Sequence, residues 1–255
     1  MRIALCLMTW NERRGCEADV PQLPVHLFDE VFAIDNGSSD GTAEYLQQHG
    51  VNVFRQDLPT YNGAYLCAFQ KVNADAIVFF HPKGTINTSS LEQFPAMLRS
   101  GHDFVVASRM IQGARNEEDQ HYFRPRKWFV LGLGAYSYLR WAGRGPVIWD
   151  VLHGYRALSR SAFERMTLTR QGITMDLEMV IQSYKLGLRA AEVPVQECER
   201  AYSSTHFKAI PTGAKLLRFL AKESLILQRQ DRSTKAAASR KANNLEQDET
   251  DGIAA

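Results

Sequence analysis

The sequence predicts an α/β fold, in which one domain is built on a mostly parallel sheet flanked by helices. Two observations lead to this prediction. Short apolar runs of strand length alternate with helix-length segments in the first half of the chain, which is the pattern of successive β-α-β units. The chain has 255 residues, of which 45% are hydrophobic and 23% charged, as expected for a globular domain with a substantial core.

The first half contains the clearest strands and helices. Apolar runs predict strands at Ile3–Met8, Val31–Ile34, Val51–Arg55, Ala76–Phe80 and Phe104–Ser108. Helices are expected at Ala43–His49 with Gly50 closing it, at Ala64–Asn73, and at Ser89–Arg99 with Ser89 or Ser90 as its cap. Ligands of such sheets bind beyond the carboxyl ends of the strands. The loops Thr9–Glu12, Asp35–Asp40 and His81–Gly84 should therefore lie together at one rim.

The second half is less regular. We expect one or two amphipathic helices in Arg124–Trp141, a turn and a strand in Asp150–Arg160, a helix over Asp176–Leu186 and a last strand at Ala191–Val195. Gly213–Gln228 reads as a long amphipathic helix, with Leu216, Leu217, Leu220 and Ile226 on one face. From residue 229 the composition is polar and poor in aromatics. We therefore expect the domain to span residues 1–228 and residues 229–255 to form a disordered tail.

Composition excludes several classes of function. A net charge of +2 gives no electrostatic case for binding nucleic acid. The four cysteines are scattered without CxxC spacing, which disfavours a structural metal and favours reduced thiols in the cytoplasm. The N-terminal segment reads as a first strand rather than a signal peptide, and no apolar stretch reaches the roughly 20 residues of a membrane span. The sequence sets no oligomeric state.

One stretch is suited to a membrane surface. Residues 124–141 combine cations for lipid phosphates with aromatic side chains, and the amphipathic helix at 213–228 is a second candidate. We therefore expect a cytoplasmic protein with peripheral contact at the inner membrane face. The alternative is that these helices pack on the domain itself or on a second subunit.

The loop after the second predicted strand carries the strongest local signal for function. Asp35 ends the strand, and a Gly/Ser turn leads to Asp40 at the start of the next helix. A carboxylate can accept a hydrogen bond from the ring N–H of a nucleotide base, and nearby backbone N–H groups can meet a phosphate. The alternative is a plain strand-to-helix turn in which Asp40 caps the helix.

Several segments together resemble family 2 glycosyltransferases with the GT-A fold. The segments are Thr9-Trp10-Asn11-Glu12, Ile34–Thr42, Ala107-Ser108-Arg109, Asp150–Arg160, Met175–Glu178, and Ala191–Val195 continuing to Arg200. They stand in the order of the family and span about residues 1–220. They look most like the branch of dolichyl-phosphate mannose synthase and bacterial polyprenyl-phosphate sugar transferases. The resemblance implies a nucleotide-sugar donor, with a UDP-sugar favoured, and a lipid-phosphate or saccharide acceptor.

The resemblance also implies roles for individual residues. Residues implied to bind the donor are Thr9, Asn11, Glu12, Asp35, Ser38, Asp40 and Arg109. Residues implied to bind the acceptor or a phosphate are Asp150, His153, Arg156, Arg200 and His206. Acidic side chains near the acceptor are Asp176 and Glu178. His153 stands where the family has Ser, and His206 stands where it has Lys. Alternatively, Arg156 pairs with Asp150 or Asp176 in a buried salt bridge, Glu178 is a solvated helix residue, and Arg200 faces solvent.

The sequence departs from the family after the fourth predicted strand. The family has Asp-x-Asp there, and its carboxylates hold Mg²⁺ or Mn²⁺ on the diphosphate, whereas this chain has His81-Pro82-Lys83. We expect no cofactor: Lys83 would supply the charge of the metal, with His81 as a second donor. Mg²⁺ or Mn²⁺ is the less favoured alternative. A phosphate acceptor needs no general base, whereas a hydroxyl acceptor would need Asp176 or Glu178.

Two other functions compete with a metal-independent transferase. In the first, the site is degenerate, and the protein binds a nucleotide sugar or a partner without turnover. In the second, weaker alternative, the chain is a nucleotidyltransferase, which would require a Gly-rich loop with Arg or Lys directly after the first strand. The segment Thr9–Arg14 contains no glycine.

Overall fold

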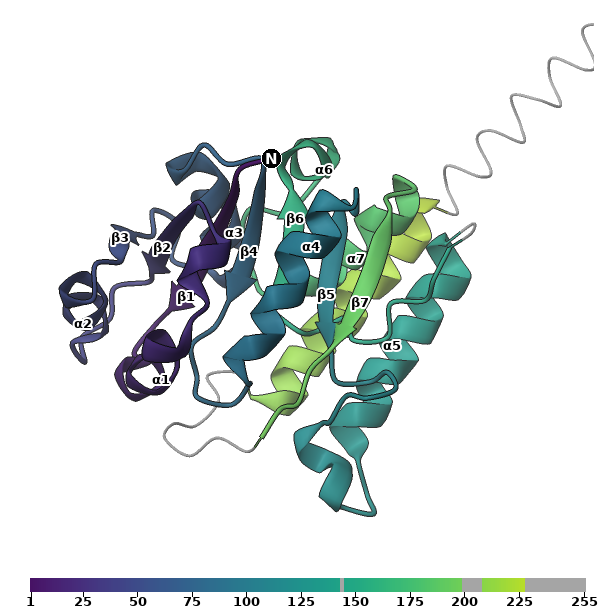
Figure 1. Ribbon diagram of the computed structural model, residues 1–255. Helices are drawn as coiled ribbons and strands as arrows, with labels where there is room; N and C mark the ends of the chain where they lie inside the picture. The colour runs from purple at the N-terminus through teal and green to yellow at the C-terminus, as the bar shows by residue number, and fades with distance from the viewer. Residues whose placement is uncertain (143–144, 199–207, 228–255) are drawn as a thin grey trace, which may run out of the picture. The chain divides into compact units, whose positions relative to one another are not determined.

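A computed structural model of the protein describes residues 1–142, 145–198 and 208–227. The chain divides into two compact units, Met1–His206 and Phe207–Ala255 (Figure 1). In the first unit, the described strands form one sheet in the order β3-β2-β1-β4-β6-β5-β7. The strands are β1 (Ile3–Thr9), β2 (Glu30–Asp35), β3 (Asn52–Arg55), β4 (Ala76–Phe80), β5 (Phe104–Ser108), β6 (Arg156–Ser159) and β7 (Ala190–Pro194). The predicted mostly parallel α/β sheet is confirmed.

Strand direction places the loops of interest at one edge of the sheet. β1 pairs in parallel with β2 and β4, and β5 pairs in parallel with β7. Only β6 among the described strands runs the other way, antiparallel to both β4 and β5. The segment that enters β6 therefore lies at the same edge as the loop that leaves β4. The register also sets Thr9 opposite Asp35 at the ends of β1 and β2.

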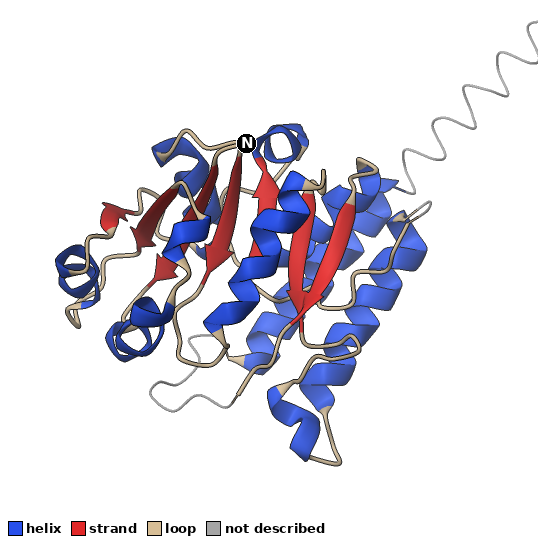
Figure 2. Cartoon of the chain, viewed as in Figure 1, coloured by secondary structure: helices blue, strands red, loops and turns tan. Residues whose placement is uncertain are grey.

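The helices that alternate with these strands along the chain pack on the faces of the sheet (Figure 2). They are α1 (Arg13–Asp19), α2 (Thr42–Gln48), α3 (Tyr61–Lys71), α4 (Gln93–Arg99), α5 (Pro125–Trp141), α6 (Arg160–Arg165) and α7 (Met175–Lys185). Short 3-10 turns are η1 (Val20–Gln22), η2 (Val25–Leu27), η3 (Thr88–Glu92) and η4 (Glu117–Gln120). Figure 1 shows α4 in front of the sheet and α7 behind it. Most expected helices are present, but α1 and α6 were not predicted.

One predicted helix cap is wrong. The segment expected as a single helix from Ser89 begins instead as the 3-10 turn η3, and Asn87 caps it by accepting the Ser89 N–H. An asparagine side chain just before the turn can reach this amide, whereas a serine already inside the turn cannot.

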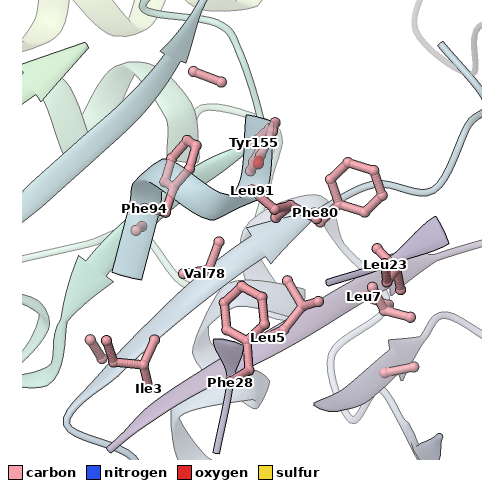
Figure 3. Close-up of a cluster of buried hydrophobic side chains, with 14 of the residues drawn as sticks. Ile3, Leu5, Leu7, Leu23, Phe28, Val78, Phe80, Leu91, Phe94 and Tyr155 are labelled. Atoms are coloured by element: carbon pink, nitrogen blue, oxygen red, sulfur yellow. The ribbon is translucent and has the colours of Figure 1, made fainter. Parts of the chain in front are cut away.

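The core explains why the strands are so apolar. All seven residues of β1 are buried, because helices cover both faces of the sheet. Figure 3 shows side chains of β1 and β4 packed against α4 and Tyr155; the labelled members are Ile3, Leu5, Leu7, Leu23, Phe28, Val78, Phe80, Leu91, Phe94 and Tyr155. Each large side chain buried in this way contributes about 1.5–3 kcal/mol. The site loops therefore stand on a rigid base.

The second unit contains a helix over residues 209–227, close to the predicted 213–228. Leu216 and Leu220 are buried, whereas Leu217 and Ile226 are exposed, so the four leucine and isoleucine residues do not share one buried face. The predicted tail at 229–255 lies outside the described residues, and the domain boundary at 228 stays a prediction. Among the described helices, none is long and apolar enough to cross a bilayer.

Candidate active site

The first part of the site is the loop after β2. Asp35 is buried, and its Oδ1 accepts hydrogen bonds from Thr9 Oγ1 at 3.0 Å and Ser38 Oγ at 2.5 Å. Its Oδ2 accepts the backbone N–H groups of Gly37 at 2.9 Å and Ser38 at 2.8 Å. The carboxylate thus holds the loop in a closed turn. Three of the predicted donor-binding residues, Thr9, Asp35 and Ser38, therefore lie together.

The loop after β1 is fixed to the loop after β2. The Asn11 N–H donates to Ser38 Oγ at 2.8 Å, and the Glu12 N–H donates to Thr42 Oγ1 at 3.1 Å. Asn11 adopts a left-handed conformation with φ of 53°, and its Oδ1 accepts the Ser39 N–H at 2.8 Å. Asn is one of the few residues that tolerate this conformation. Asn11 and Glu12 therefore join the Asp35 loop as expected.

Asp40 has the local role that a turn residue would have. Its Oδ1 accepts the Thr42 N–H at 3.1 Å and also the Thr42 hydroxyl, and its Oδ2 accepts the Arg13 N–H at 3.0 Å. Burial acts against the charged form, but these hydrogen bonds lower the pKa of Asp40 below its ordinary value. Asp40 thus ties the starts of α1 and α2 together, but the N-cap of α2 is Gly41, so the expectation that Asp40 itself is the cap is wrong by one residue.

The loop after β4, residues 81–84, carries the departure from the family. The backbone of Pro82 and Lys83 lies against α1 so closely that a Cβ on Gly15 would lie 2.8 Å from Lys83 Cα. The Gly84 N–H donates to Asp19 Oδ2 at 2.8 Å. The ring of His81 stacks on that of Tyr61, with centroids 6.0 Å apart. Both predicted catalytic residues of this loop, His81 and Lys83, therefore lie at the rim with the Asp35 loop.

Asp176, at the start of α7, is the centre of a buried hydrogen-bond network. Its Oδ2 accepts from Tyr61 Oη at 2.8 Å, and its Oδ1 accepts from Tyr65 Oη at 3.2 Å. Arg156 Nη2 lies 3.2 Å from Oδ1, and the arginine is fully buried. Burial raises the pKa of Asp176, and the arginine and the tyrosine hydroxyls oppose that effect. The buried salt bridge considered for Arg156 is what the structure contains.

Arg156 also fixes the segment that enters β6. Its Nε donates to the His153 carbonyl oxygen at 3.0 Å, Nη2 donates to the same oxygen, and Nη1 donates to the Asp176 carbonyl oxygen at 2.9 Å. All three guanidinium nitrogens are thus engaged inside the protein. Because Arg156 is also fully buried, a bound phosphate could contact it only if neighbouring residues moved.

A second ion-pair network surrounds Arg109. Its Nε and Nη2 contact both oxygens of Asp150, at 2.7 and 2.9 Å, in a bidentate pair. Its Nη1 lies 2.8 Å from Glu197 Oε2. Burial alone would raise the pKa of Asp150, but the Arg109 guanidinium outweighs burial and lowers it. Arg109 was expected to bind the donor, and Asp150 was expected to bind the acceptor or a phosphate. In the structure the two side chains bind each other as one ion pair.

His153 lies buried next to this network. Its Nδ1 has no hydrogen-bond partner among the described residues, and the residue is only 6% exposed. Burial first, and then the Arg109 charge, lower the pKa of His153 to about 4. The ring is therefore neutral near pH 7 and can donate or accept a hydrogen bond.

Lys83 links the two networks electrostatically. Its positive charge lowers the pKa of His153, of Asp176 and of Glu197, after larger effects of burial and of the two arginines. His153 lies in the segment that enters β6, Asp176 on α7 and Glu197 in the segment after β7. The backbone of Lys83 itself is placed by its close contact with Gly15 on α1.

The residues of this loop do not fit Mg²⁺ or Mn²⁺. Both ions prefer oxygen ligands, whereas the loop offers an imidazole and an ammonium, and a lysine ammonium has no lone pair to give. The nearby carboxylates of Asp150 and Asp176 are each paired with an arginine. Within the described residues no group of three or more His, Cys, Asp or Glu could hold a metal ion.

Three predicted residues lie away from these networks or outside the described residues. Glu178 is buried, and its oxygens accept from Thr169 N–H at 2.7 Å and Thr174 Oγ1 at 2.7 Å. It therefore fixes the segment before α7, and the solvated alternative is wrong. Arg200 and His206 lie outside the described residues, so their roles stay predictions.

Sequence reasoning missed several residues that shape the site: Gly15, Asp19, Tyr61, Tyr65 and Glu197. Gly15 and Asp19, like Tyr61 and Tyr65, are spaced i to i+4 and share one face of a helix, but neither α1 nor the first turn of α3 was predicted, so this spacing gave no signal. Glu197 carried no signal in the sequence either.

Several known proteins are similar to this chain in sequence. It is 27% identical over 197 residues to glycosyltransferase AglJ of Haloferax volcanii, covering 75% of this chain and 62% of that protein. It is 26% identical over 228 residues to the low-salt glycan biosynthesis hexosyltransferase Agl6 of the same organism, covering 86% of this chain and 52% of Agl6. The chain thus spans little more than half the length of these relatives.

Two further matches concern a lipid-phosphate enzyme and the fold. An undecaprenyl-phosphate mannosyltransferase of Micrococcus luteus is 22% identical over 220 residues, covering 78% of this chain and 85% of that protein. Among solved structures, glucosyl-3-phosphoglycerate synthase of Mycobacterium tuberculosis in complex with UDP is similar, with a TM-score of 0.67 and 18% identity, covering 88% of this chain and 80% of that one. This likeness shows that the fold is GT-A-like.

The family is shown by a match over more than half of the chain. The description Glycosyl transferase family 2 matches residues 22–167, a range that includes the Asp35 loop, the His81-Pro82-Lys83 loop and the Arg109–Asp150 pair. The chain belongs to glycosyl transferase family 2.

Proposed function

We propose that the protein transfers a sugar from a nucleotide-sugar donor, with a UDP-sugar favoured, without using a metal ion. The observation that carries the proposal is the position of Lys83 in the loop after β4, which lies against α1 at the same rim as the Asp35 loop, where the resemblance implies the Asp-x-Asp motif. The similar synthase of Mycobacterium tuberculosis was solved with Mn²⁺ and UDP-glucose. A uridine nucleotide is therefore the first donor to test.

In the proposed reaction, an acceptor oxygen bonds to the anomeric carbon of the sugar while the bond from that carbon to the diphosphate oxygen breaks. The bonding electrons leave with the nucleoside diphosphate, whose negative charge increases. The Lys83 ammonium would stabilise that charge by direct contact. His81, which stacks on Tyr61, would act as a second donor when protonated.

The occupied carboxylates favour an acceptor that is already ionised. Asp176 accepts from two tyrosine hydroxyls and pairs with Arg156, and Glu178 holds the segment before α7. A general base needs a lone pair directed at the acceptor proton. A phosphate oxygen needs no base, so a lipid phosphate is favoured over a saccharide. The similarity to an undecaprenyl-phosphate mannosyltransferase supports this choice and the polyprenyl-phosphate branch of the family.

Donor hydrolysis with and without EDTA tests the proposal directly. A screen of UDP-, GDP- and dTDP-sugars by thermal shift identifies the donor, and its turnover is then measured for the wild type, Lys83→Ala and Lys71→Ala. Lys71 is the control because it pairs with Asp57 at 3.2 Å at the end of α3. We expect EDTA to have no effect and Lys83→Ala to lose at least tenfold, or about 1.4 kcal/mol in the barrier. Loss of activity in EDTA with recovery in Mn²⁺ would refute metal independence.

The same measurements distinguish the alternative of a degenerate protein. Such a protein would show a thermal shift with a nucleotide sugar but no turnover in any combination of donor, lipid phosphate and saccharide. Turnover above the uncatalysed rate excludes this alternative.

We propose further that the protein acts in the cytoplasm and touches the inner membrane face through η4 and α5. Trp128, Tyr136 and Leu139 are exposed at helical spacing along α5, and Phe123 packs on the Trp128 ring. Nearby cations are partly neutralised, because Arg126 pairs with Glu117, and Arg124 and Lys127 both pair with Asp119. Aromatic insertion rather than charge should dominate binding. Flotation with vesicles of neutral and anionic lipid tests this, and absence of binding to both refutes it.

A further inference from the structure

Helix α1 forms a seat for the loop at residues 81–84. A Cβ atom on Gly15 would overlap the Pro82 carbonyl oxygen and would lie 2.8 Å from Lys83 Cα. Side chains do not approach backbone atoms this closely, so only glycine allows the loop to lie directly on the helix. The Cα of Lys83 is therefore placed by its contact with α1.

Asp19 holds the same loop from the next turn of α1. It follows Gly15 at i+4 spacing, and its Oδ2 accepts the Gly84 N–H at 2.8 Å, with the Lys83 backbone as a further donor. The carboxylate is only 5% exposed, and burial raises its pKa to about 6 against these hydrogen bonds. A buried carboxylate is costly unless hydrogen bonds satisfy it. Its partners here are the amides of the loop.

The beginning of α1 is fixed to the Asp35 loop. α1 starts at Arg13, directly after Glu12, whose N–H donates to Thr42 Oγ1 at 3.1 Å. The Arg13 N–H donates to Asp40 Oδ2 at 3.0 Å. One short helix thus joins the loop that follows β2 to the loop that carries Lys83.

We propose that Gly15 and Asp19 are positioning residues that hold Lys83 at a fixed place relative to the Asp35 loop, so that α1 and both loops grip a nucleoside diphosphate as one rigid unit. The proposal rests on the proposed role of Lys83. A metal ion brings its own coordination geometry, whereas a lysine ammonium ends a flexible stem and loses rotamer freedom when it binds. A fixed backbone adds no further ordering cost to that loss and keeps the ammonium within reach of the ligand site before the ligand arrives.

The ratio of the dissociation constants of uridine and UDP tests the proposal, because it isolates the contribution of the diphosphate. Calorimetric titrations of the full chain are compared for the wild type, Lys83→Ala, Asp19→Ala, Asp19→Asn and the double variant Asp19→Ala/Lys83→Ala. We expect Lys83→Ala to reduce the ratio about tenfold and Asp19→Ala about threefold to tenfold. Asp19→Asn should restore most of the ratio, since its amide oxygen still accepts the Gly84 N–H.

The double variant shows whether Asp19 acts through Lys83. If it does, Asp19→Ala has no further effect once the ammonium is gone, so the double variant matches Lys83→Ala. Additive losses in the double variant overturn the proposal. It is also overturned if hydrogen exchange shows that the Gly84 amide is no longer protected in Asp19→Ala but the uridine-to-UDP ratio is unchanged. An unchanged ratio in Lys83→Ala, or no binding of UDP by the wild type, refutes the proposed function as well.

Gly15→Ala provides a second route if Asp19→Ala does not fold. Its matched control is Gly132→Ala on α5, where an added Cβ meets nothing within 4 Å. We expect Gly15→Ala to reduce the uridine-to-UDP ratio at least threefold with uridine affinity retained, and Gly132→Ala to leave both unchanged. Equal losses for uridine and UDP in Gly15→Ala would overturn the proposal, since they would show damage to the Asp35 loop instead.

Discussion

Arg156 on β6 and Asp176 on α7 form an ion pair of 3.2 Å inside the first unit, where the arginine is fully buried. The pair joins the central antiparallel strand of the sheet to the start of a helix on its surface. Hydrogen bonds from Tyr61 and Tyr65 complete the surroundings of the carboxylate. The ion pair therefore links strand β6 to helix α7 at the candidate active site.

Removing one partner of this pair should destabilise the fold strongly. In Arg156→Met the Asp176 carboxylate would be left buried with only the tyrosine hydroxyls, which costs about 3–5 kcal/mol. Arg2→Met is the control, because Arg2 pairs with Glu30 at 2.8 Å at the surface and its loss costs under about 1 kcal/mol. Urea unfolding measures both. Similar free energies of unfolding for the two variants would contradict the prediction.

Gly154 should be needed for site geometry more than for stability. A Cβ at this position would lie 2.6 Å from Tyr61 Oη and 2.7 Å from His81 Cε1. Both side chains must move in Gly154→Ala, and the hydrogen bond from Tyr61 to Asp176 then breaks. We expect donor hydrolysis to fall at least tenfold while the free energy of unfolding falls by about 1–3 kcal/mol.

Gly132→Ala again serves as the control for Gly154→Ala, because it adds a methyl group at an exposed helical position. Wild-type hydrolysis in Gly154→Ala would show that the contact between His81, Tyr61 and the segment before β6 is not needed.

His153 should make the fold sensitive to acid. Its pKa is about 4 in the folded protein and 6.5 for an ordinary histidine, so between these values the unfolded chain binds a proton that the folded chain does not. Stability from this residue is complete above pH 6.5 and decreases as the pH falls towards 4, by about 1.4 kcal/mol for each unit of pKa difference. His153→Gln should therefore lose less stability than the wild type between about pH 7 and about pH 5.

Asp19 contributes in the opposite direction over much of the same range. Its pKa of about 6 exceeds the ordinary 3.8, so the folded chain holds an extra proton between these values and gains stability as the pH falls. Comparison of His153→Gln with the wild type leaves this effect unchanged and isolates the histidine. Parallel urea midpoints for the two proteins across the pH range would count against the assignment.

Restoring the acidic pair of the family should create metal dependence. The double variant His81→Asp/Lys83→Asp places two carboxylates at the end of β4, where oxygen ligands suit Mn²⁺. We expect its melting temperature to rise with added Mn²⁺ and its metal-free donor hydrolysis to lie at least tenfold below the wild type. Neither effect is expected for the wild type. A variant that ignores Mn²⁺ and keeps full activity would contradict the role of this loop.

The sheet was readable from the sequence because its strands are buried on both faces. Ala76–Phe80 and Phe104–Ser108 are uninterrupted apolar runs, and the structure has β4 and β5 with the same bounds. Helix α1 was not readable, because it contains Gly15 and has no side-chain cap at its start. Its stability comes from packing against the loop at 81–84, which no local pattern reports.

The candidate site was predictable where chemistry follows a strand end. Asp35 and the His81-Pro82-Lys83 loop could be placed at one rim from the parallel order alone. The partners of Asp176 could not, since Tyr61 and Tyr65 lie 115 and 111 residues away in the chain. Long-range hydrogen bonds of this kind depend on how α3 and α7 pack against each other, and a single sequence does not show that packing.

The antiparallel direction of β6 brings both ends of the segment between β5 and β6 to the same edge of the sheet. The chain leaves β5 at Ser108 and re-enters the sheet at Arg156, on the neighbouring strand, with Val106 opposite Arg156 in the register. Both ends of the intervening segment are thus anchored side by side, as in a hairpin. The segment therefore begins and ends at the candidate site, and the ion pair between Arg109 Nε near its start and Asp150 Oδ2 near its end, at 2.7 Å, closes it.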